Sequence, residues 1–185
     1  MNEREKFLED HPYIPRRFIV LDIETTGLDA ESCEIIEIAA VRFDLSEINH
    51  TTYNCLIRPI NPVPKRITEL TGITQYMVDS EGHDLIEEIS FLREFIEDLP
   101  IVAYNAKFDL GFLKKAFGQI NFKPKNKVIC ALKMARKAWD LPSYKLTYVA
   151  EAFGWDTSGS HRALKDCELA CLVYVGAARK LGKAS

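Results

Sequence analysis

An apolar run that ends in two acidic residues is the feature of this sequence that most constrains its fold. The segment Phe18–Leu21 is continuously apolar, and Asp22 and Glu24 follow it directly. Carboxylates two residues apart on a strand point to the same side. Because two buried like charges are unfavourable unless a cation joins them, the pattern predicts a metal site at the end of a strand.

The rest of the chain predicts one α/β domain. Its 185 residues suit a single domain, and a 47% apolar content is enough for a core. Strand patterns at 17–24, 34–44 and 51–58 have short links, which indicates an antiparallel meander. Two further strands, at 101–104 and 128–132, alternate with helical segments. We therefore expect a mixed sheet with helices on its faces.

Helical periodicity places the helices between and after these strands. The expected helices cover 66–70, 84–99, 108–117, further segments up to about 153, and 162–181. Gly72 is expected to end the first of them in a left-handed conformation. Residues 1–15 are expected to form a loose arm or short helix, and residues 16–182 a single domain.

Composition excludes several classes of protein. No stretch approaches the roughly 18 unbroken apolar residues of a membrane helix. The charged N-terminus lacks a following apolar block, so no signal peptide and no membrane partner are predicted, and we expect a cytoplasmic protein. The five cysteines contain no Cys-x-x-Cys pair, which argues against a zinc site or a disulfide framework.

Charge is distributed unevenly along the chain. The net charge of −3 lacks the overall basic signature of a protein that coats nucleic acid. Residues 121–145, however, contain seven bases and one acid. Two interpretations stay open for this stretch: a solvated face, or a surface that contacts phosphates near a carboxylate-rich site.

Three more residues are candidates for the same site. Asp109 is expected in the first turn of a helix after a buried strand, where an acid also simply offsets the helix dipole. Asn105 is a candidate N-cap for that helix. His161 follows Ser-Gly-Ser and is expected on a loop or cap over the site, with Asp166 on the next helix facing inward. Capping or surface exposure is the ordinary alternative for each.

Together these side chains suit one class of reaction. Oxygen ligands without cysteine favour Mg²⁺ or Mn²⁺ over zinc. Four carboxylates can hold two such ions roughly 4 Å apart, an arrangement used for phosphodiester cleavage. Histidine, which titrates near neutral pH, can accept a proton from water. The turn at 25–27, Thr-Thr-Gly, offers hydroxyl and backbone N–H groups to a phosphate.

The three motifs, in this order, resemble those of the DEDDh family of 3′–5′ exonucleases, which includes the proofreading subunit of bacterial DNA polymerase III. The motif at 22–27 reads Asp-Ile-Glu-Thr-Thr-Gly. The motif at 104–109 reads Tyr-Asn-Ala-Lys-Phe-Asp, with Tyr where many members have His. The motif at 161–166 reads His-Arg-Ala-Leu-Lys-Asp. The resemblance covers residue 17 to about residue 180.

This resemblance implies a ribonuclease H-like fold of five strands with helices on both faces. It implies two Mg²⁺ or Mn²⁺ ions, His161 as general base, and a set of four metal ligands: Asp22, Glu24, Asp109 and Asp166. It also implies contacts to the 3′-terminal nucleotide from Thr25, Thr26, Gly27, Leu28, Asn105 and Phe108. Such an enzyme releases nucleoside monophosphates from single-stranded or frayed ends.

Several alternatives stay open at this point. Both DNA and RNA 3′ ends are candidate substrates, and a DNA polymerase subunit is a candidate partner. Because the chain ends 19 residues after Asp166, it lacks the long tail of the polymerase III subunit, so we expect a free-standing enzyme or a different contact surface. A catalytically silent nucleic-acid-binding or replicase-associated module is the second hypothesis, and a phosphoesterase for small nucleotides is the third.

Overall fold

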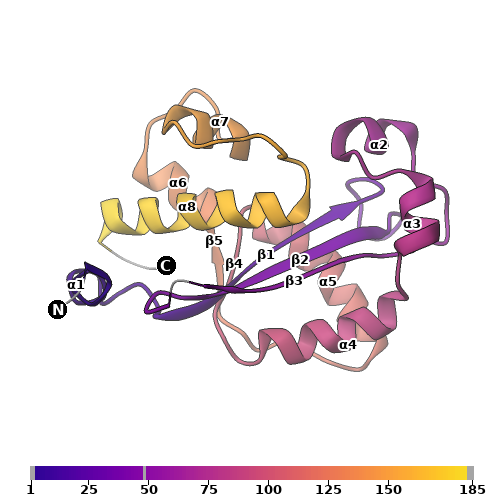
Figure 1. The fold of residues 1–185 in the computed structure, drawn as a ribbon, viewed down its shortest axis with the longest axis horizontal. Coiled ribbons are helices and arrows are strands. Elements are labelled where there is room, and N and C mark those ends of the chain that lie inside the picture. Colours follow the sequence, from indigo (N-terminus) through magenta and orange to yellow (C-terminus); the bar gives the residue numbers. More distant parts are fainter. Residues whose placement is uncertain (1–2, 48, 183–185) are drawn as a thin grey trace.

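A five-stranded mixed sheet forms the centre of the computed structural model, which describes residues 3–47 and 49–182 (Figure 1). The strands are β1 (Arg17–Thr25), β2 (Ile35–Asp44), β3 (Thr51–Leu56), β4 (Ile101–Ala103) and β5 (Val128–Cys130). Their order in the sheet is β3-β2-β1-β4-β5. The pairs β1–β2 and β2–β3 are antiparallel, whereas β1–β4 and β4–β5 are parallel. The predicted meander and mixed sheet are confirmed.

The central strand β1 is buried on both faces. Phe18 and Val20 belong to one hydrophobic core, and Ile19, Leu21 and Ile23 belong to the other. This two-sided burial explains the unbroken apolar run. Because side chains alternate along a strand, residues 22 and 24 lie on the same face as Phe18 and Val20.

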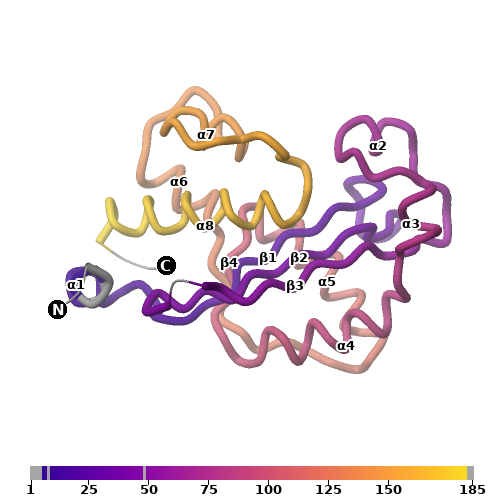
Figure 2. The backbone as a smooth tube through the Cα atoms, viewed as in Figure 1, coloured from indigo at the N-terminus to yellow at the C-terminus, as the bar shows by residue number. Residues whose placement is uncertain are grey.

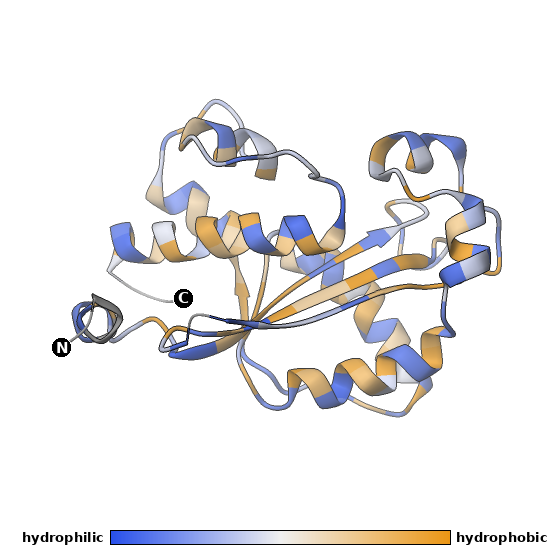
Figure 3. Ribbon diagram, in the orientation of Figure 1, coloured by the Kyte–Doolittle hydropathy of each residue, from blue (hydrophilic) through white to orange (hydrophobic). Residues whose placement is uncertain are grey.

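Helices cover both faces of the sheet, as Figures 1 and 2 show. They are α1 (Glu3–Asp10), α2 (Lys65–Thr71), α3 (Gln75–Glu81), α4 (Leu85–Ile96), α5 (Ala106–Gln119), α6 (Ala131–Ala138), α7 (Leu146–Ala152) and α8 (Ala163–Leu181). Helices α6, α7 and α8 lie over one face, and α4 and α5 lie over the other. Figure 3 shows the mixed colouring of these helices, which is typical of amphipathic segments with one face on the sheet.

Small side chains let α8 lie close to the sheet. Cys167, Ala170 and Ala177 are fully buried. The Cys167 thiol lies 3.6 Å from the carbonyl oxygen of Val20 and 3.5 Å from that of Ala39. This cysteine is therefore a packing residue between α8 and the sheet.

The structure differs from the predicted elements at short segments. Helix α3 was not predicted, because Val78 is its one buried residue and a single position gives no periodic pattern. Its one local cue is Thr74, whose hydroxyl accepts a hydrogen bond from the Met77 amide. Strand β5 ends at Cys130, where α6 begins, instead of continuing to 132. Gly72 ends α2 with a φ of 75°, as predicted.

The N-terminal segment contains a short helix that packs on the domain. Phe7 of α1 packs against the core on the α8 face. The Arg179 guanidinium lies 5.7 Å from the centre of the Phe7 ring. Ile14, between α1 and β1, is buried in the same core. Among the helices described, none is both long enough and apolar enough to cross a membrane.

Candidate active site

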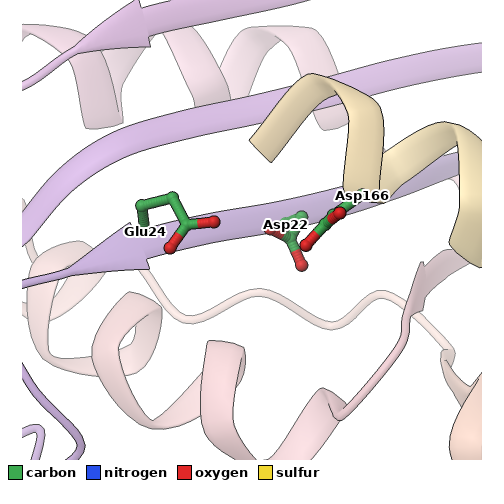
Figure 4. Close-up of side chains that lie close together, drawn as sticks. All are labelled: Asp22, Glu24 and Asp166. Carbon is green, nitrogen blue, oxygen red and sulfur yellow. The ribbon is translucent and has the colours of Figure 1, made fainter. Parts of the chain in front are cut away.

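Three carboxylates converge at the end of β1. Asp22, Glu24 and Asp166 each offer an oxygen atom, and these three atoms lie within 4.8 Å of one another. Figure 4 shows Asp22 and Glu24 on β1, with Asp166 reaching them from the first turn of α8. Hard oxygen donors grouped in this way suit a divalent cation.

Asp109 approaches the same place from α5. Its helix follows β4, which runs parallel to β1, and the carboxyl ends of parallel strands meet at one edge of a sheet. The side chain is 3% exposed and lies outside the group of three oxygens, but it lines the same hollow of about 170 Å³. Asn105 is the N-cap residue of α5, as predicted, and its side chain makes no capping hydrogen bond.

Burial and mutual repulsion disturb the ionisation of this cluster. Burial, followed by the charges of Asp109 and Asp166, raises the pKa of Asp22 well above its usual range. Burial and the charge of Asp166 raise the pKa of Glu24 to about 8. Burial raises the pKa of Asp109 to about 7, and backbone hydrogen bonds oppose this shift. Burial also raises the pKa of Asp166. Such perturbed clusters are typical of functional sites.

The structure places His161 on the loop just before α8. Its φ is 66°, which is uncommon for a residue other than glycine. The backbone N–H of His161 donates to Oδ1 of Asp166 at 3.3 Å. His161 lines the hollow together with the four carboxylates. The left-handed backbone therefore brings the imidazole to the carboxylate cluster.

An ion pair that was not predicted from the sequence, between a buried carboxylate and a partly exposed arginine, anchors this loop. Glu37 of β2 accepts hydrogen bonds from Arg162 at 2.7 Å (Nη2) and 3.1 Å (Nε), and from the Ala163 amide at 2.9 Å. Hydrogen bonding to Glu37 raises the pKa of Arg162. Glu37 also stands opposite Glu24 in the β1–β2 register. The sequence contains one indication of this pair, because Glu37 is the single carboxylate inside the apolar run at 35–41.

Hydrogen bonds of the Thr25 and Thr26 hydroxyls stabilise the turn that follows Glu24. The Thr25 hydroxyl donates to the carbonyl of Gly27 at 2.6 Å, and the Thr26 hydroxyl accepts from the Glu34 amide at 2.9 Å. A Cβ added at Gly27 would lie 2.6 Å from the sulfur of Cys33, so a larger residue would displace that side chain. The three residues therefore shape the turn beside the carboxylates.

The other three predicted contact residues surround a neighbouring hollow. Leu28, Asn105 and Phe108 line a space of about 270 Å³. Asn105 and Phe108 also line the carboxylate hollow, so the two spaces adjoin. Leu28 is 86% exposed, so its side chain is accessible to a ligand in this space.

Comparisons with known proteins agree with this geometry. The exonuclease family model matches residues 19–174. The DNA polymerase III subunit epsilon of Aquifex aeolicus is 40% identical over 162 residues, which are 85% of this chain and 78% of that protein. The PolC-type DNA polymerase III of Thermotoga maritima is 39% identical over 173 residues, which are 90% of this chain and 12% of that protein.

Solved structures share the fold. Escherichia coli exonuclease I, crystallised with a dT13 oligonucleotide, superposes with a TM-score of 0.74 at 21% identity. The match covers 88% of this chain and 40% of that one, and it confirms the predicted ribonuclease H-like fold. Since the family model spans most of the sequence, the chain belongs to the exonuclease family of phosphodiester hydrolases.

Proposed function

We propose that this protein is a metal-dependent 3′–5′ exonuclease that releases nucleoside monophosphates from single-stranded or frayed DNA. One observation carries the proposal: Asp22, Glu24, Asp109 and Asp166 line one hollow with His161, directly beside a second space of about 270 Å³. The polarity is supported by the resemblance of the three motifs to DEDDh exonucleases.

The donor set fits two divalent cations, Mg²⁺ or Mn²⁺. Every candidate ligand is a carboxylate, and burial keeps the pKa values of all four high, so a cation at this position would relieve an existing electrostatic strain. Asp22, Glu24, Asp109 and Asp166 are the residues that would hold the ions. When bound, such ions lower the pKa of an attacking water and stabilise charge on the leaving oxygen.

The protein side chains then have separate tasks. His161 accepts the proton of the attacking water as general base. The turn of Thr25, Thr26 and Gly27 supports the 3′-terminal nucleotide, and Leu28 packs against its base. Asn105 and Phe108 line both hollows and orient the sugar and the scissile phosphate between them.

The relatives favour DNA over RNA. One is named as the epsilon subunit of DNA polymerase III and one as a PolC-type DNA polymerase III, and exonuclease I was crystallised with a deoxyoligonucleotide. We propose a DNA 3′ end as the substrate, a DNA polymerase as the partner, and the cytoplasm as the place of action.

The test uses 5′-labelled single-stranded DNA and RNA of one sequence, with Mg²⁺, Mn²⁺ or EDTA. We expect stepwise shortening from the 3′ end that EDTA abolishes, and faster shortening of DNA. Asp22→Ala and Asp166→Ala should be inactive, whereas Glu168→Ala, which removes an exposed acid of the same helix, should keep full activity. Activity that persists in EDTA or in Asp166→Ala would overturn the proposal, and inactive wild-type protein that still binds DNA would indicate a silent binding module.

A further inference from the structure

A basic hollow adjoins the carboxylate hollow. It measures about 500 Å³ and lies between the start of α5, strand β5 and helix α6. Four cationic side chains line it: Lys107, Lys133, Arg136 and Lys137. Its lining contains no acidic residue, whereas the carboxylate hollow contains four. Two neighbouring hollows of opposite charge therefore share one face of the protein.

Asn105 connects the hollows. It lines the carboxylate hollow, the hollow beside Leu28 and the basic hollow. Lys107 lines both the basic hollow and the hollow beside Leu28. A nucleic-acid strand that passes Asn105 can thus contact all three hollows along one surface.

Among the residues that the structure describes, the three lysines of the basic hollow are not held by ion pairs, whereas Arg136 stacks on the ring of Tyr144. Lys107, Lys133 and Lys137 form no ion pair with an acidic residue in the described part of the chain. Lys107 and Lys133 lie in the first turns of α5 and α6, where the helix dipole disfavours positive charge. Lys133 and Lys137 are four residues apart on α6, where like charges repel. A bound anion would offset each of these unfavourable terms.

We propose that the basic hollow binds the phosphate backbone of the strand just upstream of its 3′ terminus, an inference that rests on the proposed function. The carboxylate cluster repels a polyanion, so the strand needs compensating positive charge close to the cleavage point. The basic hollow supplies that charge next to Asn105. The sequence stretch 121–145 contributes three of the four cations, and Lys107 joins them from α5.

The test compares two double variants that remove the same charge. Lys133→Gln with Lys137→Gln alters the basic hollow. Lys114→Gln with Lys123→Gln alters a mainly apolar hollow beside Phe117 and Phe122, and neither of these two lysines lines the basic hollow. Affinity for a 5′-labelled single-stranded dT12 is measured by fluorescence anisotropy in EDTA over a series of salt concentrations. Hydrolysis of the p-nitrophenyl ester of thymidine 5′-phosphate, which has no upstream strand, is measured with Mn²⁺.

We expect the Lys133/Lys137 variant to lose two phosphate contacts. The slope of the logarithm of affinity against the logarithm of salt concentration should then be shallower than that of the wild type by about 1.4. This is equivalent to about 25-fold weaker binding at 0.1 M salt. Its hydrolysis of the small ester should match the wild type, and the Lys114/Lys123 variant should behave as wild type in both assays. Equal affinity and equal slope in the two variants would overturn the inference. Failure of the wild type to hydrolyse the ester would instead overturn the proposed function, because the binding assay needs no catalysis.

Discussion

Arg162 and Glu37 form a two-point ion pair beneath the loop that carries His161. The carboxylate of Glu37 is 1% exposed, while the Arg162 side chain is 40% exposed. The two residues therefore differ in how they tolerate the loss of their partner. Arg162 can turn to solvent, but Glu37 would remain a buried charge with only the Ala163 amide.

We accordingly predict that Arg162→Ala destabilises the protein more than Glu37→Gln does. Loss of one partner from a buried pair typically lowers the free energy of unfolding by 3–5 kcal/mol, and partial exposure reduces this to about 2–3 kcal/mol. Urea unfolding measures the change. The double variant should lose less than the sum of the single variants. Similar losses for the two single variants would contradict this account.

Neutralising a metal ligand should stabilise the cation-free protein while it abolishes activity. In EDTA at pH 8, Asp22→Asn removes a carboxyl group whose ionisation is disfavoured by burial and by the charges of Asp109 and Asp166. Each kcal/mol gained should raise the Tm by about 2–4 °C. Asp29→Asn is the control and should lower the Tm, because hydrogen bonds from Ser32 and Glu31 favour the charged form of Asp29 and lower its pKa. A lower Tm for Asp22→Asn in EDTA would show that its charge is not under strain.

The stability of the cation-free protein should fall as pH rises. The pKa of Glu24 is about 8 in the folded state, against a usual value of 4.5. Between these values the folded state holds more protons than the unfolded state, so the free energy of unfolding decreases with increasing pH. The stabilisation that protonated Glu24 gives to the folded state is fully present below pH 4.5 and is lost above about pH 8.

Added Mg²⁺ or Mn²⁺ should reverse this trend. At a cation concentration 100 times the Kd, stability rises by about 2.7 kcal/mol, or about 5–10 °C in Tm. The gain should be greater at pH 8 than at pH 5, where protons compete for the carboxylates. Thermal scans at both pH values measure it. A larger gain at pH 5 would refute the carboxylate site.

His161→Asn should slow the reaction without loss of cation binding. Asparagine tolerates the positive φ of this position, so the backbone hydrogen bond to Asp166 is retained. Removal of a general base typically lowers kcat by 10²–10⁴-fold. The Mn²⁺-induced rise in Tm should match the wild type. If that rise disappears as well, His161 acts on the metal site and not as the base.

Leu28→Ala should weaken substrate binding without affecting the fold. The side chain is 86% exposed, so its truncation removes almost no core contact. Burial of a leucine against a base contributes on the order of 1.5 kcal/mol, which corresponds to an increase in KM of about tenfold. Ile60→Ala is the matched control, because Ile60 is 94% exposed and lines a different hollow. An unchanged KM for Leu28→Ala would show that this side chain does not contribute to substrate binding.

Long periodic segments made most of the fold predictable. β1 was evident because burial on both faces leaves an uninterrupted apolar run, and α4 because its apolar positions repeat with the helical period. Helix α3 and the end of β5 were not predicted, since α3 has a single buried residue and β5 has three residues, which are too few to define a period.

The candidate site was visible in sequence only where its motifs are local. The pairs Asp22 with Glu24 and His161 with Asp166 each lie within one short segment. The contact of Arg162 with Glu37 spans 125 residues, and only the folded sheet and α8 bring the two together. Lys107 likewise joins the cations of α6 only through the packing of α5 beside β5.

The carboxylate cluster can assemble only after α8 has been synthesised, because Asp166 lies on that helix. A chain emerging from the ribosome presents Asp22 and Glu24 early, but Asp166 and the Arg162 anchor arrive only with the C-terminal helix. Until α8 packs on the sheet, the three oxygens of the cation site cannot be assembled. A nascent or partly unfolded chain in which α8 is not packed on the sheet therefore lacks the assembled carboxylate cluster.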